Sequence, residues 1–172
     1  SDADTALTVN ARCVTEGVPL VLELLGVAAR DPAAIAHVAQ DAARRRYYRA
    51  APPHGGWVAW DEPARRVVGF VRACDFGPLP SPWGAPRTAS AGHELAIVKA
   101  ECTREQCQQQ PGTVGPVEGT AVWVAAADEW VRVRRIRVGA AERDAAEVLQ
   151  EGSRLGPASG GPPVGREVGR GA

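Results

Sequence analysis

The sequence contains no methionine, and it is poor in aromatic residues and histidine, with only two tyrosines, two phenylalanines and three histidines. No apolar run approaches the ~20 residues that a membrane-spanning helix needs. The first residues, SDADTALTV, lack the basic and apolar segments of a signal peptide. Lysine and arginine number 20 together, as do aspartate and glutamate, so the positive excess of a general nucleic-acid binder is missing. We therefore expect a cytoplasmic protein that binds neither nucleic acid nor membrane.

Cysteine and histidine are too few and too scattered for a zinc site. The four cysteines are Cys13, Cys74, Cys102 and Cys107, and only the last two are close in sequence. A zinc site usually combines two such pairs, or one pair with spaced histidines. The histidines are His37, His54 and His93, and no two of them form a pair. The sequence predicts no metal centre and indicates reduced thiols packed as small apolar groups.

The first fifty residues carry patterns typical of a strand followed by two helices. Apolar and polar residues alternate over 7–11, which predicts a short strand. Val18, Val21 and Leu25 share one face of a helix that opens near Pro19. Asp31 followed by Pro32 is typical of a helix start, so we expect a second helix over 31–45.

The next fifty residues are richer in strand patterns. The β-prone runs 57–60 and 67–71 flank the polar stretch DEPARR, which predicts a hairpin. The prolines and glycines of 76–92 indicate a loop, and HELAIVKA over 93–100 predicts a further strand. A second loop rich in glutamine and glycine is expected over 101–119.

The stretch 119–138 admits two interpretations, a helix leading into a short strand or a bent pair of strands. The helix is favoured because Trp123, Ala126 and Trp130 share one helical face, with Thr120 as the N-cap. Its four valines favour the strand pair, because β-branched residues are poor helix formers. On the helix interpretation, 136–138 is a strand and 142–150 a helix. Residues 157–172 would form a Gly/Pro-rich tail or an edge strand at 164–168.

Two segments resemble the GCN5-related N-acetyltransferase (GNAT) superfamily, and together the resemblance covers about residues 6 to 168. GGWVAWDEPARRVVGFVRA resembles the second and third strands of that family. GTAVWVAAADEWVRVRRIRVGAAERDAAEVLQEGSRLG resembles its third helix, fifth strand and fourth helix. The resemblance implies an α/β fold in one domain, 1–172. The fold would have a mixed, mostly antiparallel sheet, splayed between strands 4 and 5 and flanked by about four helices.

The resemblance also implies acetyl-CoA as the co-substrate, bound at a Q/R-x-x-G-x-G/A turn that opens a helix. A helix N-terminus offers free N–H groups to phosphates, and glycine permits their close approach. The turn is degenerate here, because Pro111 interrupts it and Val114 stands where glycine or alanine belongs. The implied cofactor-binding residues are Ile97, Val98, Gln109, Gly112, Gly115, Gly119, Thr120 and Ala121.

Glu94, at the start of a predicted strand, corresponds to the catalytic base of many family members. The usual acid is a tyrosine on the last helix, but Gly152 occupies the matching position. The resemblance thus implies an N-acetyltransferase that acetylates a primary amine, or else a catalytically inactive GNAT-like binding or regulatory module. Its partners would be an acyl-CoA and an amine substrate, and a homodimer stays open. If 119–138 is a hairpin, an α+β interaction domain without a cofactor is the third alternative.

Overall fold

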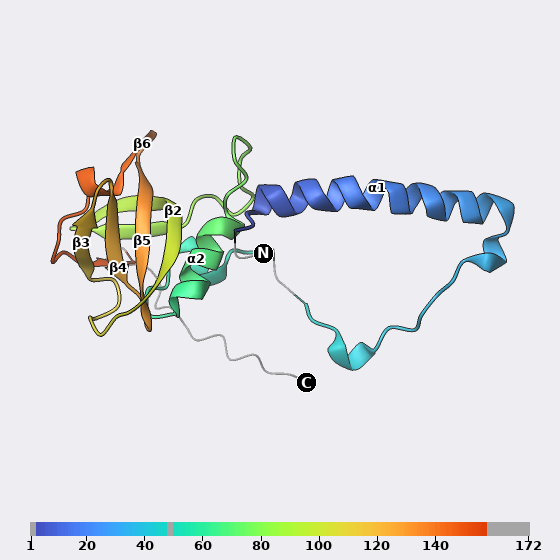
Figure 1. Cartoon of the computed structure of the whole chain (residues 1–172), viewed down its shortest axis with the longest axis horizontal. Coiled ribbons are helices and arrows are strands. Elements are labelled where there is room, and N and C mark those ends of the chain that lie inside the picture. The colour runs from blue at the N-terminus through green and yellow to red at the C-terminus, as the bar shows by residue number, and fades with distance from the viewer. Residues whose placement is uncertain (1–2, 48–49, 158–172) are drawn as a thin grey trace. The chain divides into compact units, whose positions relative to one another are not determined.

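The computed structural model describes residues 3–47 and 50–157 of the chain (Figure 1). It divides into two compact units, residues 1–50 and residues 51–172. That 1–172 acts as a single domain stays a prediction.

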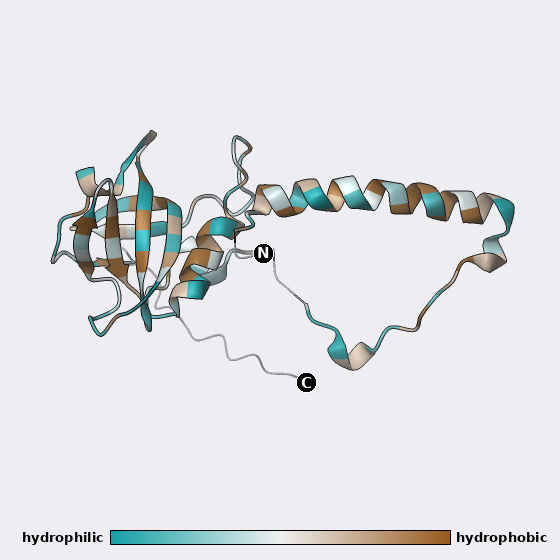
Figure 2. Cartoon of the chain, in the orientation of Figure 1, coloured by the Kyte–Doolittle hydropathy of each residue, from teal (hydrophilic) through white to brown (hydrophobic). Residues whose placement is uncertain are grey.

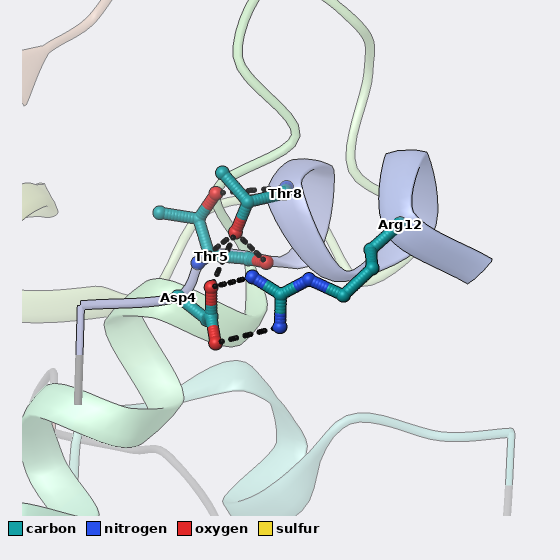
Figure 3. Close-up of polar contacts among 4 residues, drawn as sticks. All are labelled: Asp4, Thr5, Thr8 and Arg12. Carbon is teal, nitrogen blue, oxygen red and sulfur yellow. Dashed lines mark hydrogen bonds and ion pairs between the residues drawn. The ribbon is translucent and has the colours of Figure 1, made fainter. Parts of the chain in front are cut away.

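The first unit is dominated by the helix α1 (Ala6–Arg30), which begins at a reciprocal cap. The hydroxyl of Thr5 accepts a hydrogen bond from the backbone N–H of Thr8, and the hydroxyl of Thr8 accepts one from the N–H of Thr5 (Figure 3). Asp4 adds an ion pair with Arg12, at 3.2 Å. These contacts satisfy donors that every helix N-terminus leaves open. Although α1 has 25 residues, none of them is buried.

Three predictions fail wholly or in part in this unit. The expected strand 7–11 is the first part of α1, because the cap at Thr5 starts a helix there. The helix predicted around 18–25 is confirmed as part of α1, but its expected start near Pro19 is wrong, since Pro19 lies inside the helix. The expected helix over 31–45 is replaced by two short 3-10 turns, Pro32–Ala34 and Ala42–Arg44. Asp31 does cap the first turn, through a hydrogen bond from the Ala33 N–H. A helix nucleus extends only when its apolar face packs, and Val38 is 93% exposed.

The described residues of the second unit form a sheet of seven strands and one α-helix. After a 3-10 turn, Pro53–Gly56, comes α2 (Ala64–Ala73). The strands that follow are β1 (Arg87–Ser90), β2 (His93–Gln106), β3 (Val114–Glu118), β4 (Ala121–Ala125), β5 (Glu129–Val138), β6 (Ala141–Asp144) and β7 (Leu155–Gly156). A last 3-10 turn, Ala145–Glu147, lies between β6 and β7. All of the strand pairings are antiparallel.

The sheet closes on itself into a barrel. Its strand order is β3-β4-β5-β2-β1-β7, with β6 paired to β5. The chain around β7 then returns to β3, because Val114 donates to Ser153 O and Leu155 donates to Gly112 O. Closure removes the open edges that a sheet otherwise presents to other chains.

The barrel is filled by short branched side chains. Its largest fully buried residues include Ile97, Val114, Val122, Val124, Val131, Val133 and Ile136, each at most 1% exposed. α2 adds Val67, Val68 and Val71 to the same core. β-branched residues suit a pleated, half-buried surface, which explains why a valine-rich sequence builds this sheet.

The hairpin predicted for 57–71 is wrong, because 64–73 is the helix α2. Ala64, Val67, Val68 and Val71 fall at i, i+3, i+4 and i+7, and all four are buried. Pro63 occupies the N-cap and supplies no side-chain hydrogen bond. Asp128 caps the helix instead, since its Oδ1 accepts the Ala64 N–H at 2.8 Å.

The favoured helix over 120–134 is also wrong, and the strand alternative is confirmed. β4 and β5 pair in register, with Val122 opposite Val133 and Val124 opposite Val131. The inward set changes phase along β5, from Val131 and Val133 to Ile136, because the β2–β5 ladder is irregular there. A bulge shifts the two-residue period of a strand. The apolar faces therefore look mixed when the sequence is read with one uniform alternation.

The coarse fold class is confirmed, since helices accompany a mostly antiparallel sheet. The finer predictions fail. The predicted fourth and fifth strands, 93–100 and 136–138, are not splayed, because they lie in β2 and β5, which pair antiparallel. The described residues contain two α-helices rather than about four, and the helix predicted for 142–150 is replaced by β6 and a 3-10 turn. The tail or edge strand predicted for 157–172 lies almost wholly outside the described residues. Within residues 3–47 and 50–157, no helix combines the length and hydrophobicity that a membrane crossing requires.

Candidate functional site

A cavity of about 650 Å³ opens at one end of the barrel. Four parts of the chain line it: the segment Val58–Asp61 before α2, the end of β1 with the tight turn that follows it, Pro111 before β3, and the segment 154–157 around β7. Closure of the barrel brings these parts together, because β1 pairs with both β2 and β7. Its volume lies in the range of small-molecule sites, roughly 300–1,000 Å³.

The wall of the cavity is held by a buried chain of hydrogen bonds. The indole Nε1 of Trp60 donates to Thr88 Oγ1 at 3.1 Å, and the Thr88 hydroxyl reaches Gly156 O at 3.3 Å. Trp60 is 4% exposed and Thr88 fully buried. Buried polar groups that are fully paired specify one arrangement, so the cavity is preformed.

The turn at the rim of the cavity is conformationally unusual. Ala91 and Gly92 join β1 to β2 with φ of +49° and +83°. Two residues with positive φ suit the twist of a hairpin, but the first of them is normally asparagine, aspartate or glycine. An alanine in this conformation stores strain, and such strain concentrates at functional sites.

Two opposite charges line an otherwise mostly apolar cavity, Asp61 and Arg154. Arg154 Nη1 donates to the neutral amide oxygen of Gln110 at 3.0 Å. No carboxylate of the described residues lies within ion-pair distance of it. Within residues 3–47 and 50–157, the guanidinium of Arg154 thus has a neutral partner. Asp61, the other charged residue of the lining, is exposed.

The arginines of β5 differ from Arg154, because a carboxylate neutralises each of them. Arg132 pairs with Glu118, Arg134 with Glu101, Arg135 with Asp144 and Arg137 with Glu142, at 2.6–3.3 Å. The hydrogen bond from Arg137 lowers the pKa of the Glu142 carboxyl below its usual value. A row of four arginines thus presents little net positive charge to a phosphate backbone.

The outer surface near β3 holds two partly buried tryptophans. The rings of Trp123 and Trp130 lie 6.3 Å apart at a tilt of 57°. Trp123 Nε1 donates to Glu118 Oε2. Trp130 packs on Gly115 so closely that a Cβ there would lie 2.6 Å from the ring. These contacts occupy the polar edge of Trp123 and one face of Trp130, so we assign both rings a packing role.

Glu94, the predicted base, lies near the start of β2 in a surface cluster. Its carboxylate is 3.7 Å from Arg87, whose guanidinium stacks on Trp57 at 4.6 Å and donates to Gly55 O. Glu94 is exposed and does not line the cavity. That Glu94 takes part in catalysis stays a prediction.

The predicted cofactor-binding residues are distributed over the barrel and do not surround a helix N-terminus. Ile97 and Ala121 are core residues, Val98 lies on β2, and Gln109 lies in an exposed loop. Gly112 accepts the Leu155 N–H, and a Cβ at Gly112 would collide with Leu155 O. Gly115 lies under Trp130, while Gly119 and Thr120 form the turn between β3 and β4. Several of these residues thus have structural roles.

Reactive side chains are not grouped in the described part of the chain. No three histidine, cysteine, aspartate or glutamate side chains come together there as metal ligands. Cys74 is buried, which raises the pKa of its thiol and disfavours the thiolate. The cavity contains one carboxylate and one guanidinium but neither histidine nor cysteine. This arrangement can bind a charged small molecule, whereas a nucleophile with an adjacent base is absent from the cavity lining.

The described residues of the second unit form a small antiparallel barrel with a cavity at one end. Among protein families, the model of the formyl transferase C-terminal domain matches residues 52–153. Since the match covers more than half of the chain, the protein belongs to this family. The matched residues coincide with the barrel. No curated protein matches the sequence.

The family overturns the earlier functional predictions. The chain is not a GNAT protein, and neither acetyl transfer from acetyl-CoA to an amine nor acetyl-CoA as co-substrate is supported. The alternative prediction of an inactive GNAT-like module is wrong as well, because it requires the chain to be a GNAT protein. The physical error is the same in each case: the helix expected to open near Thr120 and to bind phosphates is a β-hairpin.

The residues of the cavity gave little signal in the sequence. Asp61 and Arg154 are separated by more than ninety positions, and each looked like an ordinary surface charge. Only the prolines and glycines around them indicated loops. α2, in contrast, was recognisable from the helical spacing of its apolar residues, which the hairpin interpretation overlooked.

Proposed function

We propose that the barrel serves a formyl transferase as its C-terminal domain and binds the acceptor of the formyl group. The observation that carries this proposal is the coincidence of the family match, 52–153, with a barrel that holds a preformed cavity. In formyl transfer, an amine nitrogen bonds to the formyl carbon while that carbon separates from the donor. The groups that assist this step lie elsewhere in such an enzyme.

The charges of the cavity favour a small ligand that carries charge of both signs. Asp61 suits an ammonium group and Arg154 suits a carboxylate or phosphate, since guanidinium binds such planar or branched anions well. The apolar wall formed by Trp60, Ala89 and Leu155 would cover the body of the ligand. We therefore propose diamino acids or charged diamino sugars as the acceptor class. One of their amines would pair with Asp61 as an ammonium, and the second, outside the cavity, would receive the formyl group.

A cytoplasmic location is part of the same proposal. The thiols of Cys13, Cys74 and Cys107 are free, as is usual in a reducing compartment.

The test is a formyl-transfer assay of an enzyme that contains this domain, with a formylated folate as donor and a panel of amino acids and amino sugars as acceptors. Asp61→Asn and Arg154→Gln should each raise KM for the acceptor ~10-fold and leave kcat within about twofold, because they remove ground-state binding. Arg134→Gln, on the neutralised row of β5, is the matched control and should change neither constant. An unchanged KM in both cavity variants would refute acceptor binding. A ~10²-fold loss of kcat in Asp61→Asn would instead make this carboxylate a catalytic group.

A further inference from the structure

The apolar side chains of α1 lie exposed along its whole length. Eight of its valines and leucines are 46–65% exposed: Val9, Val14, Val18, Leu20, Val21, Leu22, Leu24 and Leu25. Figure 2 shows hydrophobic colour on successive turns of this helix. Contiguous apolar surface of this kind marks an interaction site.

The angular width of the apolar surface around the axis of α1 indicates what kind of partner it can bind. At about 100° per residue, Arg12, Glu16, Glu23 and Arg30 fall within roughly 40° of one another and form one narrow polar strip. The apolar residues of the second half of α1, from Leu20 on one side to Leu22 on the other, span roughly 200°. A helix with so little polar surface is enclosed on more than one side when its partner is bound.

A second copy of the chain and a lipid surface both fit this helix poorly. A two-stranded coiled coil uses a narrow seam and would leave Leu20 and Leu22 exposed. Pro19 lies inside the helix and interrupts the regular backbone that such a seam needs. Interfacial membrane helices carry a lysine- and arginine-rich polar face. The polar strip here has two arginines and two glutamates, so it has no net charge.

We propose that α1 is an anchor that packs into the formyl-transfer part of the enzyme, between apolar elements on both of its sides, with the strip of Arg12, Glu16, Glu23 and Arg30 facing water. The assignment of the partner rests on the proposed function. The family match begins at residue 52, so α1 precedes the barrel on the side where a C-terminal domain joins the rest of its enzyme. Apolar partner surfaces on both sides of α1 would cover its whole apolar arc, from Leu20 to Leu22.

The test adds the complete chain to the formyl-transfer part of a formyl transferase expressed without its C-terminal domain. We expect a one-to-one complex and amide hydrogen exchange in α1 that is slowed ~100-fold, because the helix passes from solvent into a packed interface. Leu22→Gln and Leu24→Gln probe opposite sides of the arc, and each should weaken the complex ~10-fold or more. Glutamine keeps the helix propensity of leucine, so circular dichroism of the free chain should not change. Glu16→Gln on the polar strip is the matched control and should bind as tightly as the unaltered chain.

Three results would overturn the proposal. The first is a complex whose affinity and α1 exchange are unaffected by both leucine variants. The second is a dimer of the chain alone in sedimentation equilibrium that Leu24→Gln dissociates. The third is sedimentation of the chain with phosphatidylcholine or phosphatidylserine vesicles that depends on the same leucines. The two proposals can also fail separately. If the complex forms through α1 but the variants of Asp61 and Arg154 leave KM for the acceptor unchanged, acceptor binding is refuted, whereas the role of α1 as an anchor is supported.

Discussion

α1 and α2 both carry apolar side chains at helical spacing, but only those of α2 are buried. α2 has ten residues, and four of them are buried in the barrel core. α1 has 25 residues and more large apolar side chains, yet none of its residues is buried. The pattern of a helix therefore specifies which face will be apolar, whereas burial requires a partner surface at the right place. In this structure the barrel is that partner for α2.

The largest expected difference between the helices comes from a charge placed on each apolar face. Val68 on α2 is 1% exposed, and Val21 on α1 is 56% exposed. Val68→Asp should lower the free energy of unfolding of the barrel by about 4 kcal/mol or more, because it buries an unpaired carboxylate. Val21→Asp should change it by about 0.5 kcal/mol or less. Urea denaturation followed by tryptophan fluorescence measures both, and similar losses in the two variants would mean that α1 is packed on the barrel.

A smaller difference is expected at the caps of the two helices. The cap of α1 is local, through Thr5 and Thr8, whereas the cap of α2 comes from Asp128, 64 positions after the Ala64 it serves. Asp128→Ala should destabilise the barrel by about 1 kcal/mol, and Asp128→Asn should retain most of the stability because its amide oxygen still accepts. Thr5→Ala should reduce helical circular dichroism without moving the unfolding midpoint of the barrel. If Asp128→Ala leaves that midpoint unchanged, the cap that Asp128 forms on α2 does not contribute to the stability of the barrel.

The smallest expected effect is a difference in alkylation rate between two thiols, one on α1 and one at the C-cap of α2. Cys13 on α1 is exposed, while Cys74 at the C-cap of α2 is 8% exposed, and burial raises the pKa of its thiol despite a hydrogen bond with Ser81. A raised pKa leaves less thiolate at pH 8, and thiolate is the reactive form. Iodoacetamide should therefore alkylate Cys74 ~10-fold more slowly than Cys13, as followed by peptide mass spectrometry. In urea the two rates should converge, and equal rates in the native protein would contradict the burial of Cys74.

Some elements of the fold could be predicted from the sequence, and others could not. The strand at 93–100 and the helix around 18–25 were recognisable, because each carries an uninterrupted period of the right length. β4 and β5 were not, since the change of phase after Val133 blurs the alternation that identifies a strand. The cavity could not be predicted at all. Asp61 and Arg154 line the same cavity only because the chain around β7 closes the barrel, and nothing local in either segment encodes that closure.

The sequence by itself determined the reciprocal cap of α1, the helical spacing of Ala64, Val67, Val68 and Val71, and the even charge balance. These features depend on neighbours within a few positions, so local physics suffices to specify them. Only the tertiary structure decided that the valine-rich stretch 121–138 becomes two strands, and that Asp128 caps a distant helix. It also decided that Arg154 has a neutral amide as its partner within the described residues, while the arginines of β5 are paired with carboxylates. Each of these depends on which distant groups the closed barrel brings within hydrogen-bonding distance, and short-range sequence patterns carry no information about that.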